Sequence, residues 1–149
     1  MNSPAPRDFL LLALSSCLGA WFTYSGGAKL FVGGLDKFTQ DVGNYQILSR
    51  PWDAAAAYTV PWVEIIVGVC LILGMFRKGA LLVLAGLVFV FALAVGWAWV
   101  HGLDISCGCH GSDEKLNYWP KTFELTGYLV LIAIMAWLET TSKSRQSVE

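Results

Sequence analysis

Charge is what this sequence has least of. Only 14% of its 149 residues are Asp, Glu, Lys or Arg, whereas soluble domains carry about 25%. The formal net charge is −1, so no excess of basic residues favours nucleic-acid binding. Hydrophobic residues make up 56% of the chain, and the mean hydropathy is +0.56. These values argue against a soluble protein and predict a single membrane domain, residues 1–149, surrounded by the lipid bilayer.

Cysteine is also scarce. Four cysteines are too few for a disulfide-rich secreted scaffold. The haem-attachment pattern C-x-x-C-H is absent, because only one residue separates Cys107 from Cys109, and no standard zinc spacing occurs. A cleavable signal peptide is not indicated either. The apolar run after Arg7 continues to Leu30 without a convincing cleavage site, which favours a membrane-spanning helix.

Long apolar runs are what the sequence has in abundance. Four of them are long enough to cross the hydrocarbon core as helices, and they predict an all-α integral membrane protein built as a four-transmembrane-helix bundle. A short amphipathic surface helix is also expected in the first outer loop, within residues 35–48. The predicted spans are approximately residues 9–31, 54–76, 79–100 and 121–138.

The basic residues predict the orientation. Short segments next to the spans carry them at Arg7, Arg77, Lys78, Lys143 and Arg145. The positive-inside rule places these segments, and therefore both termini, in the cytoplasm. In a bacterium the chain then lies in the inner membrane, and the loop with Cys107 and Cys109 lies in the periplasm, where disulfide chemistry is permitted.

The pattern Cys107-Gly108-Cys109-His110 predicts the chemistry. A C-x-C pair can close a small, strained disulfide ring, and strain makes a disulfide oxidising and labile. His110 can favour the thiolate of a neighbouring cysteine or accept a proton during exchange. We predict Cys107, Cys109 and His110 as catalytic residues and no metal site. The alternatives are a static structural disulfide, thiols without a function, and a metal site completed by His101 or Asp104.

The first two predicted spans each contain one charged residue. Lys29 lies in the outer part of the first span and Glu64 about two turns into the second. An ionised side chain in lipid needs a partner, so we predict an ion pair between Lys29 and Glu64. This pair either locks two helices together or belongs to a proton route or substrate contact beneath the cysteine loop.

Tryptophans and two further cysteines form the remaining candidates. Aromatic side chains near the outer interface can line a flat pocket for a quinone ring, although interfacial anchoring is their commoner role. Cys17 and Cys70 fall at similar depth in their spans and could meet, but free cysteine commonly serves as a small buried apolar residue. The residues of the predicted quinone pocket are Trp62, Trp97, Trp99 and Trp119.

Three motifs in order resemble a known family. They are Gly26-Gly27-Ala28-Lys29-Leu30, Pro61-Trp62-Val63-Glu64 and Cys107-Gly108-Cys109. Over roughly residues 9–138 the chain is similar to the methylamine-utilisation protein MauE, within the DoxX-like group of four-helix membrane proteins. One position departs from the pattern, because the family usually has phenylalanine where this chain has His110.

The resemblance implies disulfide formation or thiol redox transfer in the periplasm with a thioredoxin-like partner. By analogy with other four-helix thiol oxidoreductases, electrons would pass from the partner's dithiol to Cys107–Cys109 and then to a membrane quinone; no other cofactor is indicated. A non-catalytic accessory subunit of a larger membrane complex is the alternative. A small-molecule carrier is a third, against which the sparse polar lining and the lack of an inverted repeat argue.

Overall fold

The computed structural model describes residues 6–105 and 117–146, with side chains from 9 to 105 and from 117 to 139. Within these ranges the fold is all-α and contains no strand. The predicted fold class is therefore confirmed, including a short helix between the first two long helices. The helices are α1 (Pro6–Phe31), α2 (Leu35–Asn44), α3 (Trp52–Ile72), α4 (Arg77–Val100) and α5 (Tyr118–Gln146).

The long helices α1, α3, α4 and α5 are each long and apolar enough to cross a membrane. They expose large apolar side chains that a soluble protein would bury, such as Leu82 at 75%, Phe123 at 72% and Trp137 at 65%. Surfaces of this kind imply a lipid bilayer as the surroundings. The chain is thus a multi-pass membrane protein.

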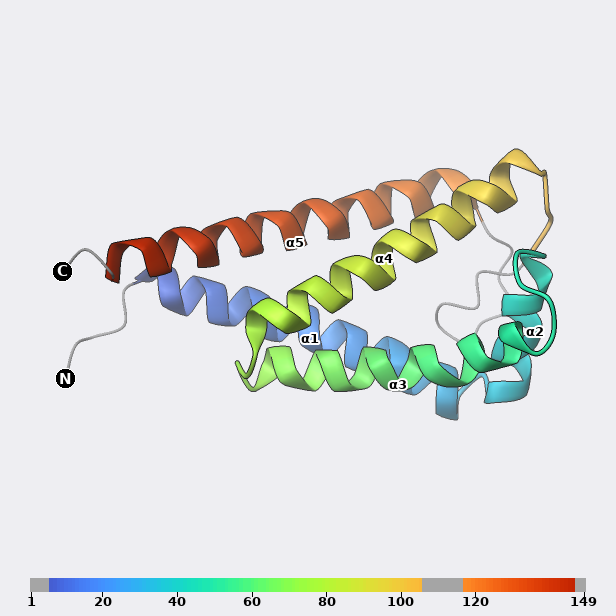
Figure 1. Ribbon diagram of the computed structural model, residues 1–149, viewed down its shortest axis with the longest axis horizontal. Helices are drawn as coiled ribbons and strands as arrows, with labels where there is room; N and C mark the ends of the chain where they lie inside the picture. Colours follow the sequence, from blue (N-terminus) through green and yellow to red (C-terminus); the bar gives the residue numbers. More distant parts are fainter. Residues whose placement is uncertain (1–5, 106–116, 147–149) are drawn as a thin grey trace.

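The helices are arranged as two pairs (Figure 1). Helix α1 packs mainly on α3 and α5 packs mainly on α4, while α2 lies against α3. The start of α1, the connection from α3 to α4 and the end of α5 lie toward one end of the molecule. At the other end lie α2, the start of α3, the end of α4 and the start of α5.

Glycines allow the first pair to approach closely. A Cβ atom added to Gly19 would lie 2.5 Å from the carbonyl oxygen of Gly68, and one added to Gly26 would lie 2.7 Å from that of Pro61. The backbones of α1 and α3 are therefore in direct contact, as small residues permit in membrane helices. Helix α1 is consequently held at a fixed distance from α3.

The two pairs are joined at the end where α3 turns into α4. Four side chains from α3, α4 and α5 are nearly inaccessible there: Leu71, Leu81, Leu84 and Met135. An ion pair between Arg77 Nε and Glu139 Oε1, at 3.3 Å, ties the start of α4 to α5. Because the two helix pairs pack closely at this end, the space between them lies toward the opposite end.

Candidate functional site

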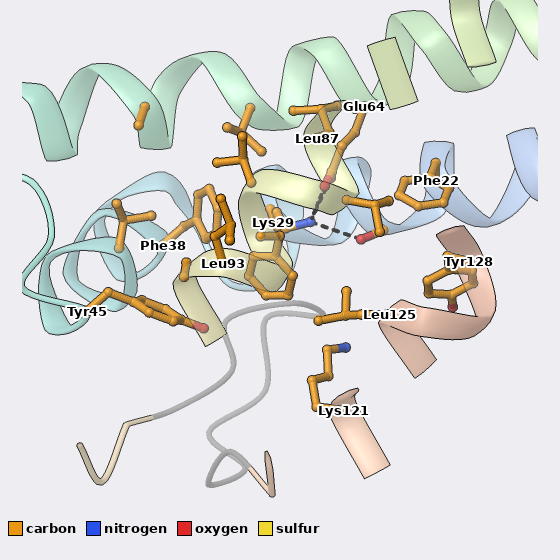
Figure 2. A pocket seen from close by; sticks show the side chains of 18 of the residues that line it. Phe22, Lys29, Phe38, Tyr45, Glu64, Leu87, Leu93, Lys121, Leu125 and Tyr128 are labelled. Atoms are coloured by element: carbon orange, nitrogen blue, oxygen red, sulfur yellow. Dashed lines mark hydrogen bonds and ion pairs between the residues drawn. The ribbon is translucent and has the colours of Figure 1, made fainter. Parts of the chain in front are cut away.

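A cavity of about 490 Å³ occupies the end of the bundle opposite this core. All five helices contribute side chains to its wall, which is mostly apolar. Figure 2 shows these side chains converging from both helix pairs. The residues in the wall with polar side-chain groups are Ser25, Lys29, Tyr45, Glu64, Lys121, Glu124 and Tyr128, together with Trp21 and Trp97.

Lys29 and Glu64 meet at the wall of this cavity. The Lys29 ammonium donates to both carboxylate oxygens of Glu64, at 2.6 and 2.9 Å, and to Ser25 Oγ at 2.9 Å. Both side chains are buried, with 6% of Lys29 and 8% of Glu64 exposed. The structure thus brings the two predicted residues into contact (Figure 2). Whether the pair has a structural or a proton-linked role stays a prediction.

A second ion pair lies on the opposite wall and was missed by the sequence reasoning. The Lys121 ammonium donates to Glu124 Oε2 at 2.9 Å, and the Tyr128 hydroxyl donates to Glu124 Oε1 at 3.0 Å. Lys121 is buried, although it opens the fourth predicted span, where a lysine ordinarily reaches the interface. The available signal was the spacing i, i+3, i+7, which puts three polar residues on one face of an apolar helix.

Tyr45 contributes a buried phenol that no pattern in the sequence indicated. Its side chain follows α2, packs on the Phe91 ring at 6.4 Å between ring centroids, and is 6% exposed. Burial, reinforced by the charge of Asp41 and by Tyr118, raises the pKa of Tyr45. The hydroxyl has no hydrogen-bond partner among the described residues. The Tyr45 side chain lines the cavity (Figure 2), but its hydroxyl oxygen is itself inaccessible.

The ends of the segment with the predicted catalytic residues are anchored beside this cavity. The Tyr118 hydroxyl donates a hydrogen bond to the carbonyl oxygen of Leu103, and Ile105 is buried. The contact joins the chain after α4 to the first turn of α5. Cys107, Cys109 and His110 themselves lie outside the described residues.

Replacing Tyr118 with phenylalanine is expected to lower the free energy of unfolding by about 1 kcal/mol, because one partly buried hydrogen bond is lost. Tyr58→Phe is the matched control, since the Tyr58 side chain is half exposed. Denaturant titration of both variants in the same mixed micelles measures the difference. Equal stability of the two variants would contradict the anchoring role.

The four predicted pocket tryptophans do not all line this cavity. Trp97 lies in its wall, whereas Trp62, Trp99 and Trp119 do not. The rings of Trp99 and Trp119 contact each other at 5.6 Å between centroids, and both side chains are exposed. Such exposure suits interfacial anchors. A quinone pocket at the tryptophans stays a prediction.

The remaining candidates are distributed elsewhere. Cys17 is exposed and Cys70 half-buried, and both are free thiols. Over residues 6–105 and 117–146, no three or more His, Cys, Asp or Glu side chains are grouped so as to hold a metal ion. His101 stacks on Trp97 at 4.0 Å between ring centroids.

Comparisons with known proteins give one finding. A family model described as methylamine utilisation protein MauE matches residues 7–138. No curated protein and no solved structure matches the chain.

Proposed function

This chain belongs to the methylamine utilisation protein MauE family, and on that premise we propose that it is a thiol–disulfide redox protein of the bacterial inner membrane. Membership itself suggests an accessory membrane protein of methylamine utilisation. The proposal adds the chemistry: Cys107 and Cys109 form the redox pair and support disulfide formation in periplasmic proteins. Its place in the wider DoxX-like group stays a prediction from the order of the motifs.

One arrangement supports this proposal most. The cavity, with the buried Lys29–Glu64 pair and the partly buried Lys121–Glu124 pair in its wall, lies at the end of the bundle where α4 ends and α5 begins. That segment carries Cys107 and Cys109, and Leu103 and Tyr118 hold its two ends. The residues that bound this segment therefore lie at the same end of the bundle as a cavity lined by protonatable groups.

The orientation is part of the proposal. The basic pair Arg77-Lys78 forms the start of α4, at the same end as the start of α1 and the end of α5. The positive-inside rule assigns this end to the cytoplasm. Both termini are then cytoplasmic, and the segment with Cys107 and Cys109 is periplasmic, on the oxidising side.

The exchange reaction is a pair of thiolate displacements. A thiolate of a thioredoxin-like partner attacks one sulfur of the Cys107–Cys109 disulfide and forms a mixed disulfide, and the released thiolate takes up a proton from His110. The second thiol of the partner then displaces the other cysteine. The partner leaves with a disulfide, while Cys107 and Cys109 hold the two electrons and two protons as thiols.

Replacing Cys107 or Cys109 with serine tests the proposal. Periplasmic client proteins should then accumulate as free thiols, which alkylation before electrophoresis reveals as a shift in mobility. Cys17→Ser is the matched control, because Cys17 is a free thiol on the exposed face of α1. Unchanged client oxidation in the Cys107→Ser and Cys109→Ser variants would contradict the redox role. Co-purification of such fully functional variants in a stoichiometric complex would instead support a non-catalytic subunit.

A further inference from the structure

The cavity between the two helix pairs is open at its side. Five apolar side chains of its wall, from the α2–α3 connection and from α4, are between 42% and 64% exposed: Ile47, Leu48, Val90, Leu93 and Trp97. Helix α4 is long and apolar enough to span the membrane, so its exposed side chains face the bilayer. The opening of the cavity therefore faces hydrocarbon, and a molecule of the bilayer can enter it without passing through water.

The polar groups of the wall are mainly covered by carbon. Five polar residues of the wall are at most 9% exposed: Ser25, Lys29, Tyr45, Glu64 and Lys121. The charged groups are paired, Lys29 with Glu64 and Lys121 with Glu124. The hydroxyl oxygen of Tyr45 is inaccessible as well. The surface that the cavity presents to an occupant is consequently mainly apolar.

Hydrocarbon suits such a surface better than water does. A water molecule in a protein cavity needs roughly two to four polar partners, and apolar cavities remain dry. An empty cavity is unfavourable too, because the atoms of its wall lose their dispersion contacts on one side. Both lysines of the wall already have a carboxylate partner, so an anionic group gains little by entering. The complementary occupant is an uncharged hydrocarbon chain whose polar end stays outside.

We propose that an acyl chain of a bilayer phospholipid enters the cavity between α4 and the α2–α3 connection and packs between the two helix pairs. The volume of about 490 Å³ falls in the range of roughly 300–1,000 Å³ that small-molecule pockets occupy. Trp97 at the opening lies in the last turn of α4, and tryptophan is typical of the boundary between hydrocarbon and head groups. The head group stays at this boundary, while the chain fills the space that the helices leave.

Photolabelling of the full-length chain in phosphatidylcholine nanodiscs tests the proposal. The nanodiscs contain phosphatidylcholine with a diazirine in one acyl chain, and mass spectrometry locates the label after irradiation. Label is expected on Phe22, Phe38 and Leu125, which come from α1, α2 and α5, line the cavity and are only 5–9% exposed (Figure 2). Lipid around the protein does not reach side chains buried to this extent, so their label reports a chain inside the cavity.

Two residues of α4 serve as internal references. Val95 is 2% exposed and does not belong to the cavity wall, so it should stay unlabelled. It lies within about two turns of the same end of the bundle as Leu125, so depth in the bilayer does not explain a difference between them. Phe89 is 54% exposed outside the cavity, and the surrounding lipid should label it in every variant. The measured quantity is the ratio of label on the three wall residues to label on Phe89.

Filling the cavity should remove this label. Ala94 is a half-buried residue of the wall, so Ala94→Trp should reduce the ratio to the level of Val95. Leu82→Trp is the matched control, because Leu82 is 75% exposed on the same helix and lies outside the wall, and it should leave the ratio unchanged. Circular dichroism of both variants checks that their helix content is equal.

Two results would overturn the proposal. One is wild-type label that is no stronger on Phe22, Phe38 and Leu125 than on Val95, a comparison that needs no variant. The other is an unchanged ratio in a folded Ala94→Trp variant.

An excess of oleate distinguishes a phospholipid from a free fatty acid. The ratio should withstand oleate, because both lysines of the wall are already paired. Loss of the wall label on adding oleate would assign the cavity to a free fatty acid and overturn the phospholipid. This inference does not rest on the proposed function, and neither result concerns the thiol chemistry, so the lipid site and the redox role are tested separately.

Discussion

Glu64→Gln is expected to lower the free energy of unfolding by about 3 kcal/mol or more, because it leaves a buried ammonium without its counter-charge. Lys29 Nζ lies 2.6 Å from Glu64 Oε2, and only 6% of Lys29 is exposed. After the substitution, the ammonium keeps neutral partners alone, Ser25 Oγ and the new amide oxygen. Unfolding in mixed micelles with increasing SDS, followed by circular dichroism, measures the change.

The double variant Lys29→Met/Glu64→Gln should recover most of this loss, since it contains no unpaired buried charge. The recovery defines a coupling energy through a double-mutant cycle. Arg50→Gln is the control, because Arg50 is 88% exposed and its ion pair with Asp53, at 3.8 Å, contributes about 1 kcal/mol at most. A Glu64→Gln variant no less stable than Arg50→Gln would contradict the picture of a buried, coupled pair.

The same set of variants distinguishes the two roles predicted for the pair. If Lys29 and Glu64 only join α1 to α3, the double variant restores both stability and client oxidation. If they also carry protons, stability returns and client oxidation does not. The readout of function is the alkylation shift of periplasmic client proteins, compared at equal amounts of folded chain.

The Lys29–Glu64 contact shows what the sequence could predict. Four long apolar runs fix the fold class, because only helices satisfy their own backbone hydrogen bonds in lipid. Two opposite charges inside such runs then have to find each other, and the first two predicted spans contain no other charged residue. The ion pair between Lys121 and Glu124 was not predicted, because both residues lie in the first turn of the fourth predicted span. Charged residues at the end of a helix normally reach water.

The cavity could not be predicted at all. It arises because α1 and α3 are fixed to each other by glycines, while α4 and α5 pack closely on them near Leu71, Leu84 and Met135 and leave a space toward the other end. Such a separation depends on packing angles that no local pattern encodes. Tyr45 is likewise an ordinary loop tyrosine until the fold buries both its ring and its hydroxyl. Cys107 and Cys109 remain predictions from their spacing and from the family.

Gly68→Ala should destabilise the bundle by about 2–3 kcal/mol relative to Gly27→Ala. A Cβ atom at Gly68 would lie 2.6 Å from the Gly19 carbonyl oxygen and 2.9 Å from the Thr23 nitrogen, whereas one at Gly27 meets nothing within 4 Å. Both changes raise helix propensity equally, so the difference reports the α1–α3 contact. SDS titration of the two variants measures it, and equal stabilities would show that the close contact contributes nothing.

The glycine contact and the ion pair should also prove to be coupled. Gly68 follows Glu64 by one turn on the same face of α3, and Gly26 on α1 would place its added Cβ atom 3.1 Å from the Glu64 Cβ. The methyl group added by Gly68→Ala moves α1 away from α3 and lengthens the distance between the Lys29 ammonium and the Glu64 carboxylate. The ion pair is then already weakened before Glu64→Gln removes the carboxylate. The double variant Gly68→Ala/Glu64→Gln should therefore lose less stability than the sum of the two single losses. Strict additivity would mean that the ion pair adjusts to the wider spacing, and the glycines would then set helix packing without setting the geometry of the charged pair.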